Sequence, residues 1–153
     1  MALRTIVTRE DPVLRKHSRP VEQVDDRIRT LLDDMYETMK DVGVGLAAVQ
    51  VGILRRVVVI DVGDEHGRID LVNPVVIETE GEQREIEGCL SCPGESGYTL
   101  RPEKVTVRAL DRDGNEFTMT GTGLLARAFC HEIDHLDGIL FTDNAVEMLE
   151  DDE

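Results

Sequence analysis

The pentad His-Glu-Ile-Asp-His at positions 131–135 constrains this chain more than any other feature of its sequence. On a helix, His131 and His135 project from the same face, so one metal ion can bind both imidazoles. Glu132 follows the first histidine, where its carboxylate can reach water at the metal without occupying a coordination position. Two ligands beside a base are typical of hydrolytic metal sites. The pattern therefore predicts a helix that carries a metal centre, and the alternative is a surface helix with these residues by chance.

The residues around the pentad favour the buried helix over the surface helix. Thr122 is a suitable N-cap, and Gly138 is a suitable C-terminal stop. The two histidines continue a stripe with the helical spacing 4, 3, 4, which is formed by Leu124, Ala128, His131 and His135. We therefore expect the metal to lie in a cavity lined by core residues.

The remaining periodic segments predict one more helix and several strands. A second amphipathic helix is expected at about 25–42, capped by Asp25 or Asp26 and ended by Gly43. Extended segments are expected at 56–62, at 69–78 with an interruption at Asn73-Pro74, at 104–110 and at 115–120. The turn residues at 111–114 predict a hairpin between the last two. The predicted fold class is α+β, with mainly antiparallel sheets packed around the C-terminal metal-binding helix and the second amphipathic helix near the N-terminus.

Composition excludes several classes of protein. The chain has 153 residues with 41% hydrophobic content, which predicts a single domain over 1–153, with a frayed acidic tail at about 144–153. A formal charge of −15 with scattered Lys and Arg argues against direct nucleic-acid binding. No apolar run approaches the roughly 20 residues of a membrane span, and no secretory signal is evident. Three cysteines indicate no disulfide framework, so we expect a cytoplasmic protein.

A catalytic metal usually has three protein ligands and one open position. The candidates for the third ligand are Cys89, Cys92, His17, His66 and many carboxylates. Cys89 is favoured because thiolates bind borderline metals well and the preceding Gly88 allows a close backbone approach. Cys89 and Cys92 also form a C-x-x-C pair, which leaves open a closed four-ligand zinc site or a redox pair. Cys92 and His131 are separated by 38 residues, however, unlike a short zinc finger. Cys130 is interpreted as a packing residue.

Three segments in this order resemble the signature motifs of the peptide deformylase family. They are Gly-Val-Gly-Leu-Ala-Ala-Val-Gln at 43–50, Glu-Gly-Cys-Leu-Ser at 87–91 and the pentad at 131–135. The resemblance covers nearly the whole chain. It implies a metal-dependent hydrolase that removes the formyl group from the N-terminal formylmethionine of new proteins and releases formate. The implied cofactor is one divalent metal ion, with Fe²⁺ expected and Zn²⁺, Ni²⁺ or Co²⁺ as substitutes.

The resemblance also implies roles for particular residues. The metal ligands would be Cys89, His131 and His135. Catalysis would use Glu132 as acid and base, with the Gln50 amide and the Leu90 backbone N–H as donors to the reacting carbonyl. The residues expected to contact the substrate are Val44, Gly45, Gly88, Leu124 and Ala128, of which Val44, Leu124 and Ala128 are expected to line the methionine pocket. Glu87 and Arg101 resemble a paired carboxylate and guanidinium that brace the Cys89 loop.

The chain departs from the family pattern at three places. Ser96 stands where many relatives carry an arginine that helps to hold substrate, and Cys130 stands where a glutamine is frequent. The acidic tail lacks the basic docking helix of some relatives, which leaves only a transient ribosome contact. The expected partners are N-formylmethionyl peptides and nascent chains. Two other functions stay open, namely an HExxH metallopeptidase that cuts internal peptide bonds and a metal-binding or nascent-chain-binding protein without catalysis.

Overall fold

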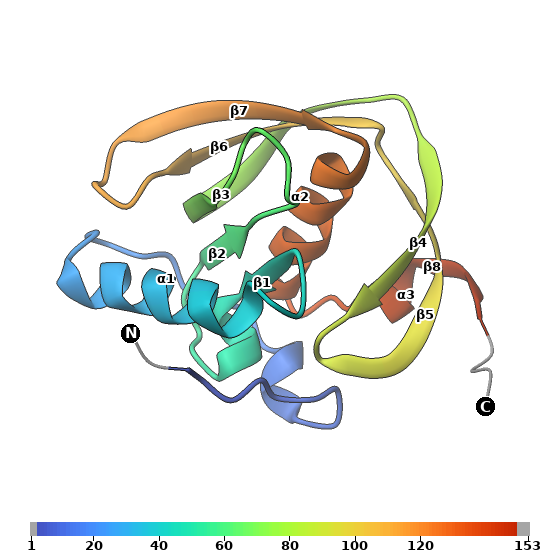
Figure 1. Cartoon of the computed structure of the whole chain (residues 1–153), viewed down its shortest axis with the longest axis horizontal. Coiled ribbons are helices and arrows are strands. Elements are labelled where there is room, and N and C mark those ends of the chain that lie inside the picture. The colour runs from blue at the N-terminus through green and yellow to red at the C-terminus, as the bar shows by residue number, and fades with distance from the viewer. Residues whose placement is uncertain (1–2, 150–153) are drawn as a thin grey trace.

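The computed structural model describes residues 3–149, which form two antiparallel sheets around a central helix (Figure 1). The first sheet has the order β1-β2-β3-β6-β7, and its strands are β1 (Gly45–Ala47), β2 (Val57–Ile60), β3 (Ile69–Glu80), β6 (Lys104–Leu110) and β7 (Glu116–Thr122). The second has the order β4-β5-β8, with β4 (Gln83–Cys89), β5 (Cys92–Arg101) and β8 (Ala145–Met148). The longer helices are α1 (Asp26–Met39) and α2 (Gly123–Leu136), and the short ones are η1 (Pro12–Arg15), η2 (Ala48–Val51) and α3 (Phe141–Asn144).

Strand β2 shows how the sheet separates two hydrophobic clusters. All four of its residues are buried, and successive side chains point to opposite faces of a strand. Val57 and Val59 pack in the cluster that includes α1, whereas Val58 and Ile60 pack in the cluster that includes α2. A helix covers each face of β2. The strand therefore needs apolar residues at every position.

Helix α1 confirms the predicted amphipathic helix but is shorter than the predicted range of 25–42. Asp25 is the N-cap, and its side chain accepts hydrogen bonds from the backbone N–H groups of Arg27 and Ile28. The helix ends at Met39, and the backbone N–H of Gly43 donates to the Met39 carbonyl. Val42, the last residue of the predicted range, is 61% exposed because it lies beyond this end.

The predicted strands are present with small shifts at their ends. The segment 56–62 shortens to β2, and 69–78 extends to β3 without a break at Asn73-Pro74. The ladder between β3 and β6 absorbs that pair by a register shift, and Asn73 adopts a positive φ of 52°. The hairpin of β6 and β7 is confirmed, and the Asp111 carboxylate accepts from the N–H groups of Asp113 and Asn115 in its turn.

The three-stranded sheet was not predicted, and it corrects one expectation. Residues 83–101 form a hairpin whose two strands meet through the turn residues Leu90 and Ser91. The prediction of a frayed tail from about 144 is wrong for Ala145–Met148, which form β8 beside β5. Gly97 allows this approach, since a Cβ there would lie 2.9 Å from the backbone carbonyl oxygen of Glu147. Residues 150–153 of the predicted tail lie outside the described residues.

Helix α2 occupies the centre of the fold, where it packs on the five-stranded sheet and reaches β5 (Figure 1). Thr122 is at the predicted N-cap position, but its side chain accepts no capping hydrogen bond. Gly138 has a φ of 77°, and a Cβ there would lie 2.6 Å from the Arg15 carbonyl oxygen, so both conformation and space require glycine. The α+β fold with antiparallel sheets around this helix is confirmed. Among residues 3–149, the structure has no helix that is long and apolar enough to span a membrane.

Candidate metal centre

Three metal-ligating side chains converge where α2 meets the end of β4. Cys89 Sγ lies 3.3 Å from His135 Nε2, which in turn lies 3.3 Å from His131 Nε2. The two imidazoles come from successive turns of α2, and the thiol comes from the last residue of β4. All three predicted metal ligands are therefore brought together by the structure.

The spacing of these atoms fits a single divalent ion. Tetrahedral bonds of about 2.3 Å to sulfur and 2.0–2.1 Å to nitrogen place neighbouring ligand atoms about 3.4 Å apart. Within the described chain, Cys92 is not part of this cluster, which argues against the closed four-ligand site. The other histidines lie elsewhere. His17 lies 3.7 Å from Asp137, and His66 lies 3.0 Å from Asp64 on the surface.

The two histidines differ in their protonation. Burial would lower the pKa of His131, but the carboxylates of Glu132 and Glu87 raise it above its usual value. Glu87 Oε1 lies 2.8 Å from His131 Nδ1, which leaves Nε2 of that ring directed at the cluster. Burial, followed by the positive potential of His131, lowers the pKa of His135 well below its usual value, so this ring is neutral. A neutral imidazole is the form that binds metal.

Glu87 belongs to a buried ionic network, and this network contains the predicted pair with Arg101. Arg101 Nε lies 2.9 Å from Glu87 Oε2, and Arg101 Nη1 lies 2.7 Å from Asp134 Oδ2. Thr99 also donates its hydroxyl to Glu87. Burial alone would raise the pKa of Glu87, but the hydrogen bonds from His131 and Arg101 hold it well below its usual value. The carboxylate is therefore charged and fixes the His131 ring, a more direct role than bracing the Cys89 loop.

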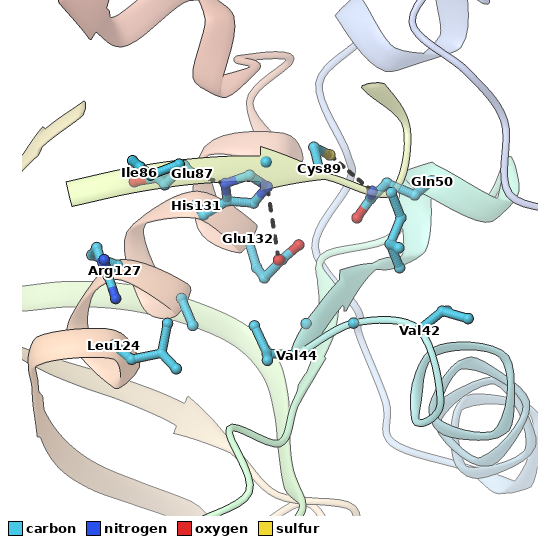
Figure 2. A pocket seen from close by; sticks show the side chains of 15 residues that line it. Val42, Val44, Gln50, Ile86, Glu87, Cys89, Leu124, Arg127, His131 and Glu132 are labelled. Carbon is cyan, nitrogen blue, oxygen red and sulfur yellow. Dashed lines mark hydrogen bonds and ion pairs between the residues drawn. The ribbon is translucent and has the colours of Figure 1, made fainter. Parts of the chain in front are cut away.

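Glu132 lies beside the metal ligands in a buried position. Its Oε2 is 3.9 Å from His131 Nε2, and its Oε1 is buried with no hydrogen-bond partner among the described residues (Figure 2). Burial raises the pKa of Glu132 to about 7, against the opposing effect of His131. Gly45 makes room for it, since a Cβ at that position would lie 2.6 Å from Glu132 Oε2. The carboxyl group can therefore exchange a proton near neutral pH.

Gln50 presents an amide donor to the same centre. Its Oε1 accepts the backbone N–H of Ala47 at 2.9 Å, and since that group can only donate, the amide nitrogen must point the other way. Gln50 Nε2 lies 3.1 Å from Ser91 Oγ and 3.4 Å from Cys89 Sγ. The short helix η2 thus aims Gln50 at the ligand cluster, as Figure 2 shows.

A pocket of about 340 Å³ opens beside these groups. It is bordered by the segment that leads into β1, by the end of β4 and by one face of α2 (Figure 2). The residues expected to contact substrate all line it, namely Val44, Gly45, Gly88, Leu124 and Ala128. Ile86 and Arg127 also line it, although the sequence analysis did not single them out. Their spacing could have identified them, because Ile86 is two residues before Gly88 on a strand and Arg127 is three after Leu124 on a helix.

The departures from the family pattern lie close to the pocket or behind it. Ser96 is opposite Gly88 in the ladder, and its carbonyl accepts the N–H of Leu149. Cys130 packs against the core on another side of α2, as expected, and burial raises the pKa of its thiol to about 11. The structure therefore places Ser96 opposite Gly88, which lines the pocket, and Cys130 outside the pocket lining.

Comparisons of the sequence with family models and with known proteins identify the same family. The model of the family described as polypeptide deformylase matches residues 3–150. The chain is 58% identical to a peptide deformylase of Acetivibrio thermocellus, over all of this chain and 89% of the relative. It is 60% identical to that of Alkaliphilus metalliredigens, over 95% of this chain and 99% of the relative.

A solved structure shares the fold as well as the sequence. The crystal structure of a peptide deformylase from Legionella pneumophila has a TM-score of 0.90 and 50% sequence identity, and the match covers 94% of this chain and 86% of that one. This chain therefore combines the fold of that structure with the ligand cluster, the buried glutamate and the adjacent pocket described above. The chain belongs to the polypeptide deformylase family and removes the formyl group from the N-terminal formylmethionine of newly made proteins.

Proposed function

We propose that deformylation takes place at the cluster of Cys89, His131 and His135, which holds one divalent metal ion, with Glu132 as the group that transfers protons. The convergence of the three ligand atoms beside a buried, unpartnered carboxylate oxygen is the observation that carries this proposal. When bound, the ion supplies a positive centre that lowers the pKa of water and polarises the formyl carbonyl. A thiolate and two imidazoles suit Fe²⁺, Zn²⁺, Ni²⁺ or Co²⁺. We expect Fe²⁺ in the cell by analogy with the family.

Glu132 takes a proton from the attacking water and delivers it to the amine nitrogen that leaves. Its raised pKa, about 7, supports both steps, because a group with a pKa near the working pH accepts and donates protons with similar ease. A general acid and base of this kind contributes roughly 10²- to 10⁴-fold to the rate. Gly45 serves the same step by leaving the space that the carboxyl group occupies.

Gln50 and Leu90 stabilise the negative charge that develops on the formyl oxygen. The Gln50 amide nitrogen is held towards the cluster by the bond from Ala47, so it needs little rearrangement to donate. Leu90 follows Cys89 in the hairpin turn and lines the pocket, which supports a donor role for its backbone N–H. One such donor contributes about 2.7–4 kcal/mol in other enzymes.

The substrate peptide lies between the open edges of β1 and β4. Both are edge strands of their sheets, and both border the pocket. Gly45 and Gly88 allow an extended chain to approach the backbone closely, and an added strand would satisfy the free backbone groups. The methionine side chain enters between Val44, Leu124 and Ala128, which present an apolar lining.

The partners follow from this substrate. The protein acts on N-formylmethionyl peptides and nascent chains, and since these are made in the cytoplasm we place the reaction there. Contact with the ribosome is transient, and the net charge of −15 gives no general attraction to nucleic acid. Residues of both sheets and of α2 line the pocket, which supports a single catalytic domain over residues 1–153.

Release of formate from formyl-Met-Ala-Ser tests the proposal directly. Protein prepared without oxygen should release formate, and Glu132→Ala should lose at least about 10²-fold in kcat while it keeps its metal. Glu116→Ala serves as the matched control, because Glu116 is an exposed glutamate on β7 outside the site. Full activity of Glu132→Ala would refute the assigned role. Cleavage of unformylated peptides would instead favour a metallopeptidase, and metal binding without turnover would favour a binding protein.

A further inference from the structure

Cys89 has a second thiol beside it that the reaction does not use. Cys89 and Cys92 are register partners at the turn end of the antiparallel β4–β5 hairpin, on either side of a two-residue turn and just after a register shift between Gly88 and Cys89. Directly opposed residues in such a ladder have Cα atoms about 4.5–5.5 Å apart. A disulfide needs Cα atoms about 4.4–6.8 Å apart, so the hairpin backbone already suits one.

The two side chains are on the same side of the hairpin. Cys92 is 1% exposed within the core cluster around α2, and Cys89 packs against that cluster. The Cys92 thiol is the largest influence that raises the pKa of Cys89, and the Cys89 thiol is the largest that lowers the pKa of Cys92. Both thiols therefore face the core cluster that contains α2.

Access to the two thiols is unequal, and this determines which one reacts first. Cys89 is half-buried and lines the pocket, whereas Cys92 is shielded behind it. A small oxidant that enters the pocket therefore meets Cys89. Cys130 lies in a different pocket, beside Leu100 and Ile139, and cannot take the place of Cys92.

We propose that Cys89 and Cys92 form a reversible disulfide when a hydroperoxide enters the pocket, and that this modification releases the metal. The Cys89 sulfur, once its proton is lost, attacks one oxygen of the peroxide, and the O–O bond breaks. Cys89 becomes a sulfenic acid, and the departing hydroxide takes up that proton to form water. The Cys92 sulfur then attacks the Cys89 sulfur, and the hydroxyl group leaves as water after the Cys92 proton is transferred. In sum, two thiols and one hydrogen peroxide give one disulfide and two waters.

Two consequences follow for the enzyme. A disulfide sulfur carries no negative charge, so Cys89 no longer acts as a thiolate ligand and only two imidazoles remain. The disulfide also prevents further oxidation of Cys89 to the sulfinic or sulfonic acid, which is irreversible. Cys92 is therefore a protective residue rather than a catalytic one. Loss of the metal rests on the proposed ligand role of Cys89, whereas formation of the disulfide does not.

Peptide mass mapping of the metal-loaded full chain tests both halves of the proposal. The protein is treated with hydrogen peroxide, its free thiols are alkylated, and it is digested with trypsin while released metal is measured. Because Pro102 protects the bond after Arg101, one peptide, 85–104, contains both cysteines, and Cys130 falls in another. The wild type should give this peptide unalkylated and lighter by two hydrogen atoms, with its metal released. Dithiothreitol followed by fresh metal should restore metal binding and activity.

Variants separate the two thiols. Cys92→Val, with Cys92→Ala as a second replacement for the buried site, should instead accumulate sulfinic or sulfonic acid at Cys89 and should not recover with dithiothreitol. Cys130→Ala is the matched control and should behave as the wild type. Alkylation of both thiols after peroxide, or equal irreversible oxidation in wild type and Cys92→Val, would overturn the disulfide and leave the ligand role intact. A disulfide that forms without metal release would overturn both the switch and the ligand role of Cys89.

Discussion

Two ionic networks in this protein have similar chemistry but very different surroundings. One joins Glu87, Arg101 and Asp134 behind the metal centre, where the Glu87 and Arg101 side chains are 6% and 7% exposed. The other joins Asp33 on α1 to Arg68 and Arg112, whose side chains are 26% and 38% exposed. The first pairs one arginine with two carboxylates, and the second pairs two arginines with Asp33 and Asp70. The clearest difference between their arginines is burial.

That difference assigns them different tasks. In the buried network, Glu87 Oε1 also lies 2.8 Å from His131 Nδ1, so the network orients a proposed metal ligand. The exposed network ties α1 to the loop before β3 and to the turn between β6 and β7. Charges removed from water must be fully paired, whereas charges near water tolerate the loss of a partner. The buried network should therefore be essential and the exposed network dispensable.

The largest expected effect is on stability, from breaking the buried network. Arg101→Met leaves Glu87 and Asp134 without their cation and should lower the free energy of unfolding by about 3–5 kcal/mol. Urea denaturation of the metal-free protein at pH 7 measures this. A loss below about 1 kcal/mol would mean that the buried network contributes no more to stability than the exposed one.

The next effect is on metal retention. Glu87→Gln keeps the size of the side chain but removes the charge that orients His131, so the dissociation constant of the metal should rise about 10- to 100-fold. Competition with a chelator measures it. The comparison predicts that Asp33→Asn leaves metal affinity unchanged, and an equal loss in both variants would abolish the proposed division of tasks.

The sequence indicated the helix that carries the histidine pair more directly than the strands around it. The histidine pair and Glu132 could be predicted because helical periodicity is a local property, which five residues display in full. The hairpin that carries Cys89 could not be predicted in the same way. Its register depends on contacts between residues far apart in sequence, such as that between Glu87 and Arg101.

The end of the chain shows the same limit. The acidic composition after residue 143 favoured a solvated tail, yet β8 forms because Gly97 lets the Glu147 backbone approach β5. Likewise, Gly45 has no side chain and so leaves room for Glu132. The spacing of apolar residues in the sequence does not predict this close approach. Such long-range packing requirements are visible only in the structure.

A smaller effect, with a defined pH dependence, is expected in the exposed network. Hydrogen bonds from Arg112 and Arg68 lower the pKa of Asp33 to about 2. A carboxylate whose pKa is lower in the folded state stabilises the protein above its unfolded pKa of about 4, and this contribution is lost as the pH falls towards 2. Asp33→Asn should therefore cost about 1 kcal/mol at pH 7, and the difference from wild type should vanish in that acidic window. A constant difference down to pH 2 in thermal or urea unfolding would contradict this origin.

The smallest effect is expected for an ion pair whose side chains are more exposed to solvent than those of the exposed network. Arg108 and Glu116 are 3.6 Å apart, with side chains 50% and 69% exposed. Glu116→Gln should change the free energy of unfolding by less than about 0.5 kcal/mol and leave formate release unchanged. A loss comparable with that of Arg101→Met would show that burial does not set the order of these effects.

X-ray absorption spectroscopy of the metal-loaded protein tests the central claim most directly, because it reports the atoms bound to the ion. The account predicts one sulfur at about 2.3 Å, two imidazole nitrogens at 2.0–2.1 Å and a further light-atom ligand from solvent. Cys89→Ser should remove the sulfur signal, and Cys92→Ala should leave it in place. A first shell without sulfur, or one with two sulfurs and two imidazoles that closes the open position, would contradict the account.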